Sequence, residues 1–463
     1  MDLSEASATF DARIAEACAE HGVPAAAYGL LLAGELVHVG AVGELPVAQA
    51  STTPFRIASM TKSFTAATIL LLRDDGALAL DAPLEEILPW AAGIGLPSSS
   101  PPIRLSHLLT MTAGFPTDDP WGDRHESTAL DDFDALVAGG LSLCRPPGLE
   151  FEYANIGYAL LGRVIAEVTR EPYAEVVRER LLEPLGMTST TFDAADARSR
   201  ATGMHPTAGG LVTQGEGPPG AFSPMGGLWS TVADLARWID FLESAWADAP
   251  EVGSLSRWSR REMQRPHIVV GHEPDGSIDS YGMGLRITDH RDLGRFVHHS
   301  GGYPGFGSHM RWHPDTRWAV VALGNRTYAP MRSVCAQALA DIVADEAAAA
   351  ARARAVTRLW PQTEEAMTLL EALLVEWDDD ALDRAAAANL DLDQSRDERR
   401  QAWAALGVRS LERDKGSVWS RSPAHAHWTV RADIGLVELD VLMTGERTPR
   451  IQAMSSARGT PSG

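Results

Sequence analysis

Ser59 and Lys62 are the residues of this chain whose types and spacing point most directly to chemistry. Positions three apart share one face of a helix, so the lysine amine can reach the serine hydroxyl and act as base for a serine nucleophile. The largely apolar run from Phe64 to Leu72 predicts a buried helix that ends at Gly76. The alternative is structural: Ser59 would cap the helix and Lys62 would be solvated, although a positive charge is unfavourable at a helix N-terminus.

Tyr153-Ala154-Asn155 is a second candidate segment, placed between a Pro-Pro-Gly turn and a predicted helix from Ile156 to Thr169. A tyrosine hydroxyl near a lysine can pass a proton between nucleophile and leaving group. An asparagine amide can hold both the lysine and a substrate. The alternative is a loop tyrosine followed by an asparagine that caps the helix.

The run from His298 to Phe306 is a third candidate segment, rich in glycine and placed between two predicted strands. Glycine lets a backbone amide approach a ligand closely, which makes Gly301 and Gly302 candidates for contact with a substrate. Taken alone, the run is also typical of a glycine-rich hairpin.

In this order and at these separations, the three segments resemble the serine β-lactamase and penicillin-binding protein superfamily, in particular its class C-like esterase and D-aminopeptidase branch. The resemblance extends from about Gly22 to about Asn325. It includes ordered phrases at residues 55–65, 105–115, 153–162, 184–187, 223–238 and 281–284.

The resemblance implies catalytic roles for the first two segments. Ser59 would be the acylated nucleophile and Lys62 the base that activates it. Tyr153 would relay the proton, with Asn155 positioning the lysine. Lys62 can act as a base only if it is neutral for part of the cycle, which requires burial and neighbouring hydrogen bonds that lower its pKa.

The resemblance also implies that the backbone amides of Ser59 and Gly302 form an oxyanion hole, in which loss of one donor typically costs about 3 kcal/mol of barrier. Gly301 would lie beside the substrate. Trp121 and Trp229 fall in segments that relatives place near the cleft. Each is a candidate for lining an aromatic or acyl pocket, and each could equally be a core residue.

His299 occupies the place where β-lactamases carry the lysine of a Lys-Thr-Gly motif. An imidazole is mostly neutral near pH 7, so we expect weaker anchoring of a substrate carboxylate than in a β-lactamase. This favours esters, amides or D-amino-acid derivatives over β-lactams. We also expect the titration of His299 to make efficiency depend on pH in the neutral range.

Motifs for other chemistries are missing from the sequence. It contains neither the Gly-x-Ser-x-Gly of α/β-hydrolases nor a phosphate-binding loop. His309 and His313 are four apart, but they fall in a predicted strand and no glutamate follows the first histidine, so a zinc site is not indicated. We predict neither a metal nor another cofactor.

The composition is that of an acidic chain of 463 residues with a net charge of −22, which opposes binding to nucleic acid and to anionic membranes. Three cysteines are too few, and odd in number, for a disulfide framework. Residues 1–22 predict an acidic amphipathic helix rather than a signal peptide, and no apolar run is long enough to span a membrane. We therefore expect a cytoplasmic location.

The resemblance implies an α/β (α+β) serine β-lactamase-like fold for residues 1–352. Strand patterns near both ends of this range and a helical middle agree with it. The resemblance implies an antiparallel sheet flanked by helices, with a helical lobe inserted at about residues 76–220. Residues 356–463 read as a small α+β domain, loosely similar to cystatin-like or NTF2-like appendages. We expect packing or homodimerisation as its role; the alternative is a loop that caps the cleft.

The sequence thus predicts a serine hydrolase that forms an acyl-enzyme on a small-molecule ester or amide. A D-amino-acid peptidase or amidase and a weak β-lactamase are alternatives within the same chemistry. From a different class, a penicillin-binding sensor would be acylated without turnover, and a retired scaffold would not react.

Overall fold

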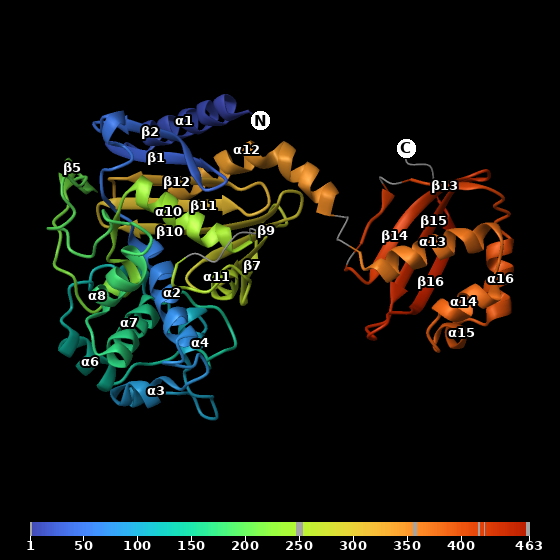
Figure 1. Cartoon of the computed structure of the whole chain (residues 1–463). Helices are drawn as coiled ribbons and strands as arrows, with labels where there is room; N and C mark the ends of the chain where they lie inside the picture. The colour runs from blue at the N-terminus through green and yellow to red at the C-terminus, as the bar shows by residue number, and fades with distance from the viewer. Residues whose placement is uncertain (1, 247–252, 355–358, 415–416, 421, 460–463) are drawn as a thin grey trace. The chain divides into compact units, whose positions relative to one another are not determined.

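The computed structural model describes residues 2–246, 253–354, 359–414, 417–420 and 422–459. The chain forms two compact units, residues 1–348 and 349–463 (Figure 1). The boundary expected from the sequence, between residues 352 and 356, falls partly on residues 355–358, which lie outside the described residues.

The first unit is built on an eight-stranded antiparallel sheet in the order β2-β1-β12-β11-β10-β9-β8-β7. Its strands come from both ends of the unit, as the sequence predicts, because β1 pairs with β12. The strands are β1 (Ala25–Leu32), β2 (Glu35–Gly43), β7 (Ile268–His272), β8 (Ile278–Tyr281), β9 (Arg286–His290), β10 (Gly294–Tyr303), β11 (Phe306–His313) and β12 (Trp318–Gly324).

Alternating residues of the central strands point to opposite faces of the sheet and belong to two different hydrophobic layers. On one face, Val320 of β12 packs with Phe10 and Ile14 of α1 (Leu3–Glu20) and Leu339 of α12 (Met331–Arg354). On the other face, Val321 belongs to the core shared with α2 (Thr61–Asp74), α10 (Val232–Glu243) and α11 (Arg257–Met263). This alternation, with a period of two, is what a sheet covered on both faces requires.

Helix α2 runs through the centre of the unit, and every residue from Thr61 to Leu72 is buried. The region where the sequence predicts a helical lobe packs around it (Figure 1). Its helices, with two that lie beyond the predicted range, are α3 (Leu84–Ile87), η3 (Pro89–Gly93), α4 (Leu105–Leu109), α5 (Asp119–Gly122), α6 (Leu130–Ala138), α7 (Asn155–Thr169), α8 (Tyr173–Val177), η4 (Arg178–Leu182), α9 (Ser223–Gly226) and η5 (Ser244–Trp246).

Short elements connect the lobe to the sheet. They are η1 (Val47–Gln49), β3 (Phe55–Arg56), η2 (Ala58–Met60), β4 (Met204–Thr207), β5 (Gly210–Thr213) and β6 (Trp229–Ser230). Strand β3 pairs with β6, and β4 forms a hairpin with β5. The β3–β6 pair holds the segment that leads into Ser59.

The second unit packs helices on a four-stranded antiparallel sheet in the order β13-β14-β15-β16. Its core joins Leu370 of α13 to Trp428 and Leu439 of the sheet. The elements are α13 (Pro361–Val375), α14 (Asp379–Ala385), α15 (Leu390–Asp393), α16 (Arg396–Ala404), β13 (Leu411–Arg413), β14 (His425–Ala432), β15 (Gly435–Met443) and β16 (Ile451–Arg458).

The small α+β unit predicted from the sequence is present. Residues 417–420 contribute an isolated bridge, Trp419 to His427, and the fourth strand of the sheet is β13.

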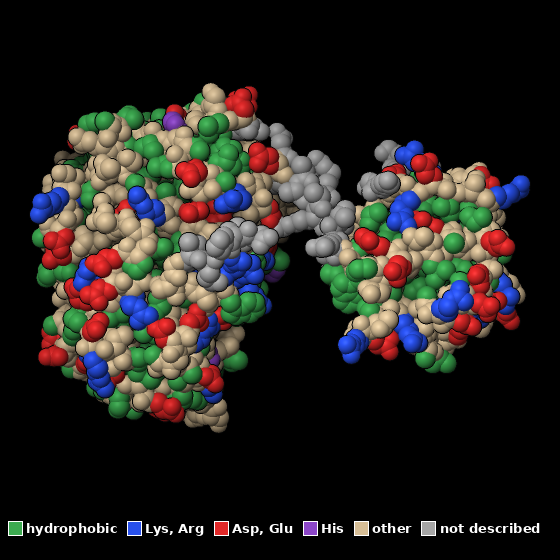
Figure 2. Space-filling view, viewed as in Figure 1, with side chains coloured by type: hydrophobic (Ala, Val, Ile, Leu, Met, Phe, Trp, Pro, Cys, Tyr) green, Lys and Arg blue, Asp and Glu red, His purple; other side chains and the backbone are tan. Residues whose placement is uncertain are grey.

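Charged side chains of both signs are interspersed over the visible face of each unit (Figure 2). On that face the acidic excess is spread out rather than gathered in one patch. Among the described residues, no helix combines the length and apolar character that a membrane crossing requires.

Candidate active site

Ser59 lies in the 3₁₀ turn η2, between β3 and the start of α2. The residue before it, Ala58, has a φ of 48°, in the left-handed region that residues with a Cβ rarely adopt. Two hydrogen bonds hold Ile57, the residue before Ala58. The Ile57 amide donates to the Leu228 carbonyl at 3.0 Å, and the Ser308 hydroxyl donates to the Ile57 carbonyl at 2.8 Å. The serine therefore sits on a strained turn that is fixed from both sides.

Lys62 is fully buried in the first turn of α2. Its Nζ donates to Ser59 Oγ at 2.9 Å, to Asn155 Oδ1 at 2.7 Å and to the Met225 carbonyl at 2.8 Å. The alternative that Lys62 is solvated and Ser59 caps the helix does not describe this structure, since α2 has no side-chain cap. The sequence spacing instead produces a direct contact between amine and hydroxyl.

Burial lowers the pKa of Lys62 to about 8, and the charges of Asp119, Asp123 and Asp118 oppose that shift. Taking an ammonium out of water penalises its charged form. A substantial fraction of Lys62 is therefore neutral just above neutral pH, as a base requires.

Tyr153 lies beside this pair. Its ring centroid is 5.0 Å from Lys62 Nζ, and its hydroxyl interacts with the Ser59 side chain. Burial of the hydroxyl raises the pKa of Tyr153 well above its usual value. The phenol is thus protonated at neutral pH, which suits a proton relay and not a general base.

Asn155 links the lysine to an acidic loop. It is the first residue of α7, and its Nδ2 donates to Asp119 Oδ1 at 2.8 Å. The helix is capped by another segment: Asp118 accepts bonds from the Asn155 amide at 2.6 Å and the Ile156 amide at 2.9 Å. The alternative that Asn155 is the N-cap is therefore wrong, and its side chain is left to bind Lys62.

His299 lies on β10 and is almost completely buried. Its Nδ1 bonds to the Ser300 carbonyl at 2.7 Å; a carbonyl only accepts, so Nδ1 carries the hydrogen. Nε2 has no partner among the described residues and remains an acceptor. Burial and then the charge of Lys62 lower the pKa of His299 to about 3, so the expectation that it titrates in the neutral range is wrong.

A cavity of about 560 Å³ brings the candidate residues together. Ser59, Tyr153, His299 and Gly302 all line it, with Lys62 behind Ser59. The complete lining is Ser59, Asp119, Asp123, Arg124, Tyr153, Arg286, His299, Ser300, Gly302, Tyr328 and Arg332.

Three predicted substrate contacts lie outside this lining. Trp229 is fully buried and packs edge-on against Phe306 at 5.2 Å, so it is a core residue. Trp121 is 38% exposed and packs against Phe222 at 5.3 Å. A Cβ on Gly301 would lie 2.1 Å from the Ile57 carbonyl oxygen, which means that this glycine allows β10 to approach the Ser59 turn.

Charged residues of the cavity were missed by the sequence analysis. Asp119 is exposed, whereas Asp123 is buried, accepts a bond from the Tyr328 hydroxyl at 2.9 Å and has its pKa raised by burial to about 6. Arg286 and Arg332 line the cavity as well. The two consecutive aspartates at 118–119 could have indicated a functional site, but solvent-exposed carboxylates give the same sequence pattern.

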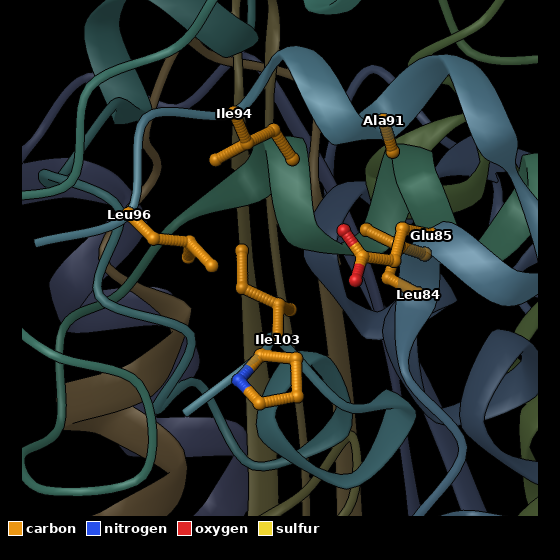
Figure 3. Close-up of a pocket in the computed structure, with 7 residues that line it drawn as sticks. Leu84, Glu85, Ala91, Ile94, Leu96 and Ile103 are labelled. Atoms are coloured by element: carbon orange, nitrogen blue, oxygen red, sulfur yellow. The ribbon is translucent and has the colours of Figure 1, made fainter. Parts of the chain in front are cut away.

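Another hollow in the lobe is too small for a substrate. It has a volume of about 20 Å³ and lies among Leu84, Ile94 and Ile103 (Figure 3). That volume admits little more than one water molecule. The candidate active site is instead the cavity lined by Ser59, Tyr153 and His299, because the candidate catalytic residues meet there.

Nothing in the described part of the chain groups three or more His, Cys, Asp or Glu side chains as a metal site would. The two histidines considered from the sequence make other contacts. His309 Nδ1 bonds to Ser300 Oγ at 2.9 Å, and His313 Nε2 bonds to the Leu293 carbonyl at 2.7 Å.

Curated relatives match more than half of this chain. Protein flp of Staphylococcus aureus (strain N315) is 29% identical over 284 residues, which are 59% of this chain and 53% of that protein. The D-alanyl-D-alanine-carboxypeptidase/endopeptidase AmpH of Escherichia coli (strain K12) is 26% identical over 286 residues, 59% of this chain and 71% of that protein. The chain thus spans about half the length of the flp proteins it matches.

Solved structures share the fold. The octameric penicillin-binding protein homologue from Pyrococcus abyssi has a TM-score of 0.64 and 23% identity. The alignment covers 97% of this chain and 93% of the homologue's chain. A D-stereospecific amidohydrolase from Streptomyces has a TM-score of 0.58 and 22% identity, covering 72% and 98%. The Beta-lactamase family model matches residues 10–344, and the chain therefore belongs to the beta-lactamase family.

Proposed function

We propose that this protein is a serine hydrolase that forms an acyl-enzyme on Ser59 and acts on carboxylic esters or amides. The observation that carries the proposal is the 2.9 Å hydrogen bond between the buried Lys62 amine and the Ser59 hydroxyl at the wall of a substrate-sized cavity. Membership of the beta-lactamase family supports the same reaction class.

In acylation, neutral Lys62 accepts the Ser59 proton as Oγ attacks the carbonyl carbon. The oxyanion that forms is stabilised by the backbone amides of Ser59 and Gly302, both of which belong to residues that line the cavity. Tyr153, protonated because its pKa is raised, then gives a proton to the leaving alcohol or amine and recovers one from Lys62.

In deacylation the same groups act in reverse order. A water molecule takes the place of the leaving group and loses its proton through Tyr153 and Lys62. The tetrahedral intermediate then collapses and restores the Ser59 hydroxyl. Transfer of the acyl group to an alcohol or amine would use the same path.

A D-amino-acid peptidase or amidase is the second candidate, and the acidic side of the cavity favours it. Asp119 and Asp123 line the cavity, and His299 Nε2 is an additional acceptor without a partner among the described residues. Acceptors of this kind suit the ammonium group of an amino-acid substrate. The names of AmpH and of the Streptomyces amidohydrolase agree with this candidate.

Reaction with β-lactams is a third candidate. A neutral His299 gives little attraction for a carboxylate, but Arg286 and Arg332 supply positive charge on the same cavity. A weak β-lactamase would release the acyl group, whereas a penicillin-binding sensor would retain it.

The decisive test combines a chromogenic short-chain ester with mass spectrometry of the intact protein. A burst followed by continued turnover, lost in Ser59→Ala, supports the hydrolase. A burst alone supports the sensor, and no reaction in either protein refutes both. Incubation with D- and L-amino-acid amides and with penicillins then shows which acyl group Ser59 carries.

Assembly between copies is proposed as the role of the second unit. The octameric homologue aligns over nearly the whole chain, including this unit, which supports self-association. Light scattering of the full-length protein at several concentrations tests it: a single monomeric mass at all concentrations would contradict assembly.

A further inference from the structure

A buried ion pair involves Arg56, three residues before Ser59 in the chain. Arg56 Nη2 donates to Glu126 Oε2, and the two side chains are only 2% and 4% exposed. Glu126 accepts two further bonds, from the Tyr303 hydroxyl at 2.7 Å and from the Ser223 hydroxyl at 3.3 Å. A single carboxylate thus accepts hydrogen bonds from three segments that are distant in sequence.

Each of the three donors is close in sequence to a residue of the proposed active site. Arg56 precedes Ser59 by three residues on β3, and Tyr303 directly follows Gly302 on β10. Ser223 begins α9, the short helix whose Met225 carbonyl accepts the bond from Lys62. The Glu126 carboxylate is therefore the point at which the nucleophile turn, the second oxyanion amide and the lysine acceptor meet.

The surroundings hold the guanidinium in one place. The Arg56 guanidinium carbon lies 4.5 Å from the Tyr303 ring centroid and 5.5 Å from that of Trp229, and the Arg56 backbone pairs with Trp229. The 223–227 segment also closes on Glu126, since a Cβ on Gly227 would lie 2.9 Å from Glu126 Oε1. A buried charge pair packed in this way has little freedom to rearrange.

We propose that Glu126 is a positioning residue that, through Arg56 and Tyr303, holds the backbone amides of Ser59 and Gly302 at the separation an oxyanion requires. The inference rests on the proposed function, because it assumes that these amides bind an oxyanion. Oxyanion stabilisation depends on preorganised donors, and small misplacements are costly to the rate.

Two variants test the proposal. Glu126→Gln removes the charge that pairs with Arg56, while Tyr303→Phe removes a single hydrogen bond and leaves the ion pair in place. The matched control is Glu243→Gln, because Glu243 is also a buried carboxylate paired with an arginine, Arg317. Glu243 is not among the residues that line the cavity.

The readouts are kcat and KM for the chromogenic ester and the Kd of phenylboronic acid. In the boronate adduct, Ser59 Oγ bonds to boron, the serine proton passes to Lys62, and the tetrahedral anion mimics the oxyanion intermediate. Rates are expressed per active site, counted by fluorophosphonate labelling of Ser59, so that unfolded protein does not enter the comparison.

For Glu126→Gln we expect kcat to fall about 30- to 100-fold with KM within about twofold, and the boronate Kd to rise by a similar factor. For Tyr303→Phe we expect changes of about three- to tenfold in the same direction, and for Glu243→Gln changes within about twofold. A role confined to stability would lower the number of active sites and leave these constants unchanged.

Other results would overturn the proposal. If folded Glu126→Gln keeps its kcat and boronate affinity, Glu126 does not position the amides, and the proposed hydrolase stands. If Glu126→Gln does not fold, an unchanged Tyr303→Phe leads to the same conclusion. If the wild-type protein neither turns over the ester nor labels at Ser59, the proposed function fails and this inference fails with it.

Discussion

The side-chain amide of Asn155 donates a hydrogen bond to Asp119 Oδ1 at 2.8 Å, and its oxygen accepts one from Lys62 at 2.7 Å. The carboxylate therefore fixes which way round the amide sits, so that Asn155 presents its oxygen and not its nitrogen to the lysine. The same arrangement connects the negative charge of Asp119 to Lys62, the proposed base, through two successive hydrogen bonds.

Asp119→Asn should lower the pKa of Lys62, since the charge of Asp119 is the largest influence that opposes the effect of burial. The base is active when neutral, so the acidic limb of the kcat/KM profile should move to lower pH by about 0.5 to 1 unit. A pH–rate series on a neutral ester measures the shift. Asp134→Asn, which removes a carboxylate paired with Arg163 in the lobe, is the control and should leave the limb in place.

In the wild-type protein the kcat/KM profile should rise with pH around a midpoint near 8. Lys62 has its pKa lowered to about 8 and must lose its proton to act, whereas His299, with a pKa of about 3, is already neutral. His299→Gln should therefore keep the midpoint within about 0.5 unit. A midpoint near 6.5 that disappears in His299→Gln would restore the role of this histidine as a titrating group.

Lys62→Met should abolish activity while leaving the fold intact. We expect kcat to fall at least about 10³-fold, because the only amine that contacts Ser59 among the described residues is lost. Replacing a buried charge by an apolar side chain of similar size removes a desolvation penalty but leaves Asn155 Oδ1 and the Met225 carbonyl without this donor. Thermal unfolding should show a change of less than about 2 kcal/mol.

An ester that carries an ammonium group should bind better than its uncharged isostere if the acidic side of the cavity recognises amines. Asp123→Asn should remove most of this preference, which we expect to be about three- to tenfold in KM. The preference should also decline as the pH falls through about 6, where Asp123 takes up a proton. Equal KM values for the two esters at pH 8 would argue against an amine subsite.

Gly301→Ala should be far more damaging than Gly302→Ala to the stability of the unit. A Cβ at position 301 would meet the Ile57 carbonyl oxygen at 2.1 Å, and this backbone is held by the Ser308 hydroxyl. At position 302 it would meet the half-exposed Tyr328 ring at 2.6 Å, which can turn away at the cost of its hydrogen bond to Asp123. We expect losses of about 3 kcal/mol or more against about 1 kcal/mol in denaturant unfolding.

Sequence patterns predicted the features that local spacing controls. The i, i+3 relation of Ser59 and Lys62 is a property of helix geometry, and it appears as a 2.9 Å contact. The sheet with strands from both ends also follows from alternating apolar residues and from the resemblance to a known superfamily.

Features that depend on tertiary surroundings were not predictable in this way. The low pKa of His299 results from burial, which its neighbours in sequence do not reveal. Trp229 could have been a pocket residue or a core residue, and only the packing of Phe306 against it decides. Asp123, the residue after α5, is buried and lines the cavity, although its sequence context is that of a surface loop.

The pairing of β1 with β12 has a consequence for folding during synthesis on the ribosome. The first strand emerges early, yet its neighbour is synthesised only when most of the first unit has been translated. At about 5 to 20 residues per second the delay is roughly 15 to 60 s. During that time the edge of β1 that pairs with β12 lacks its native partner, so chaperones that shield nascent strands should strongly affect the yield of folded protein.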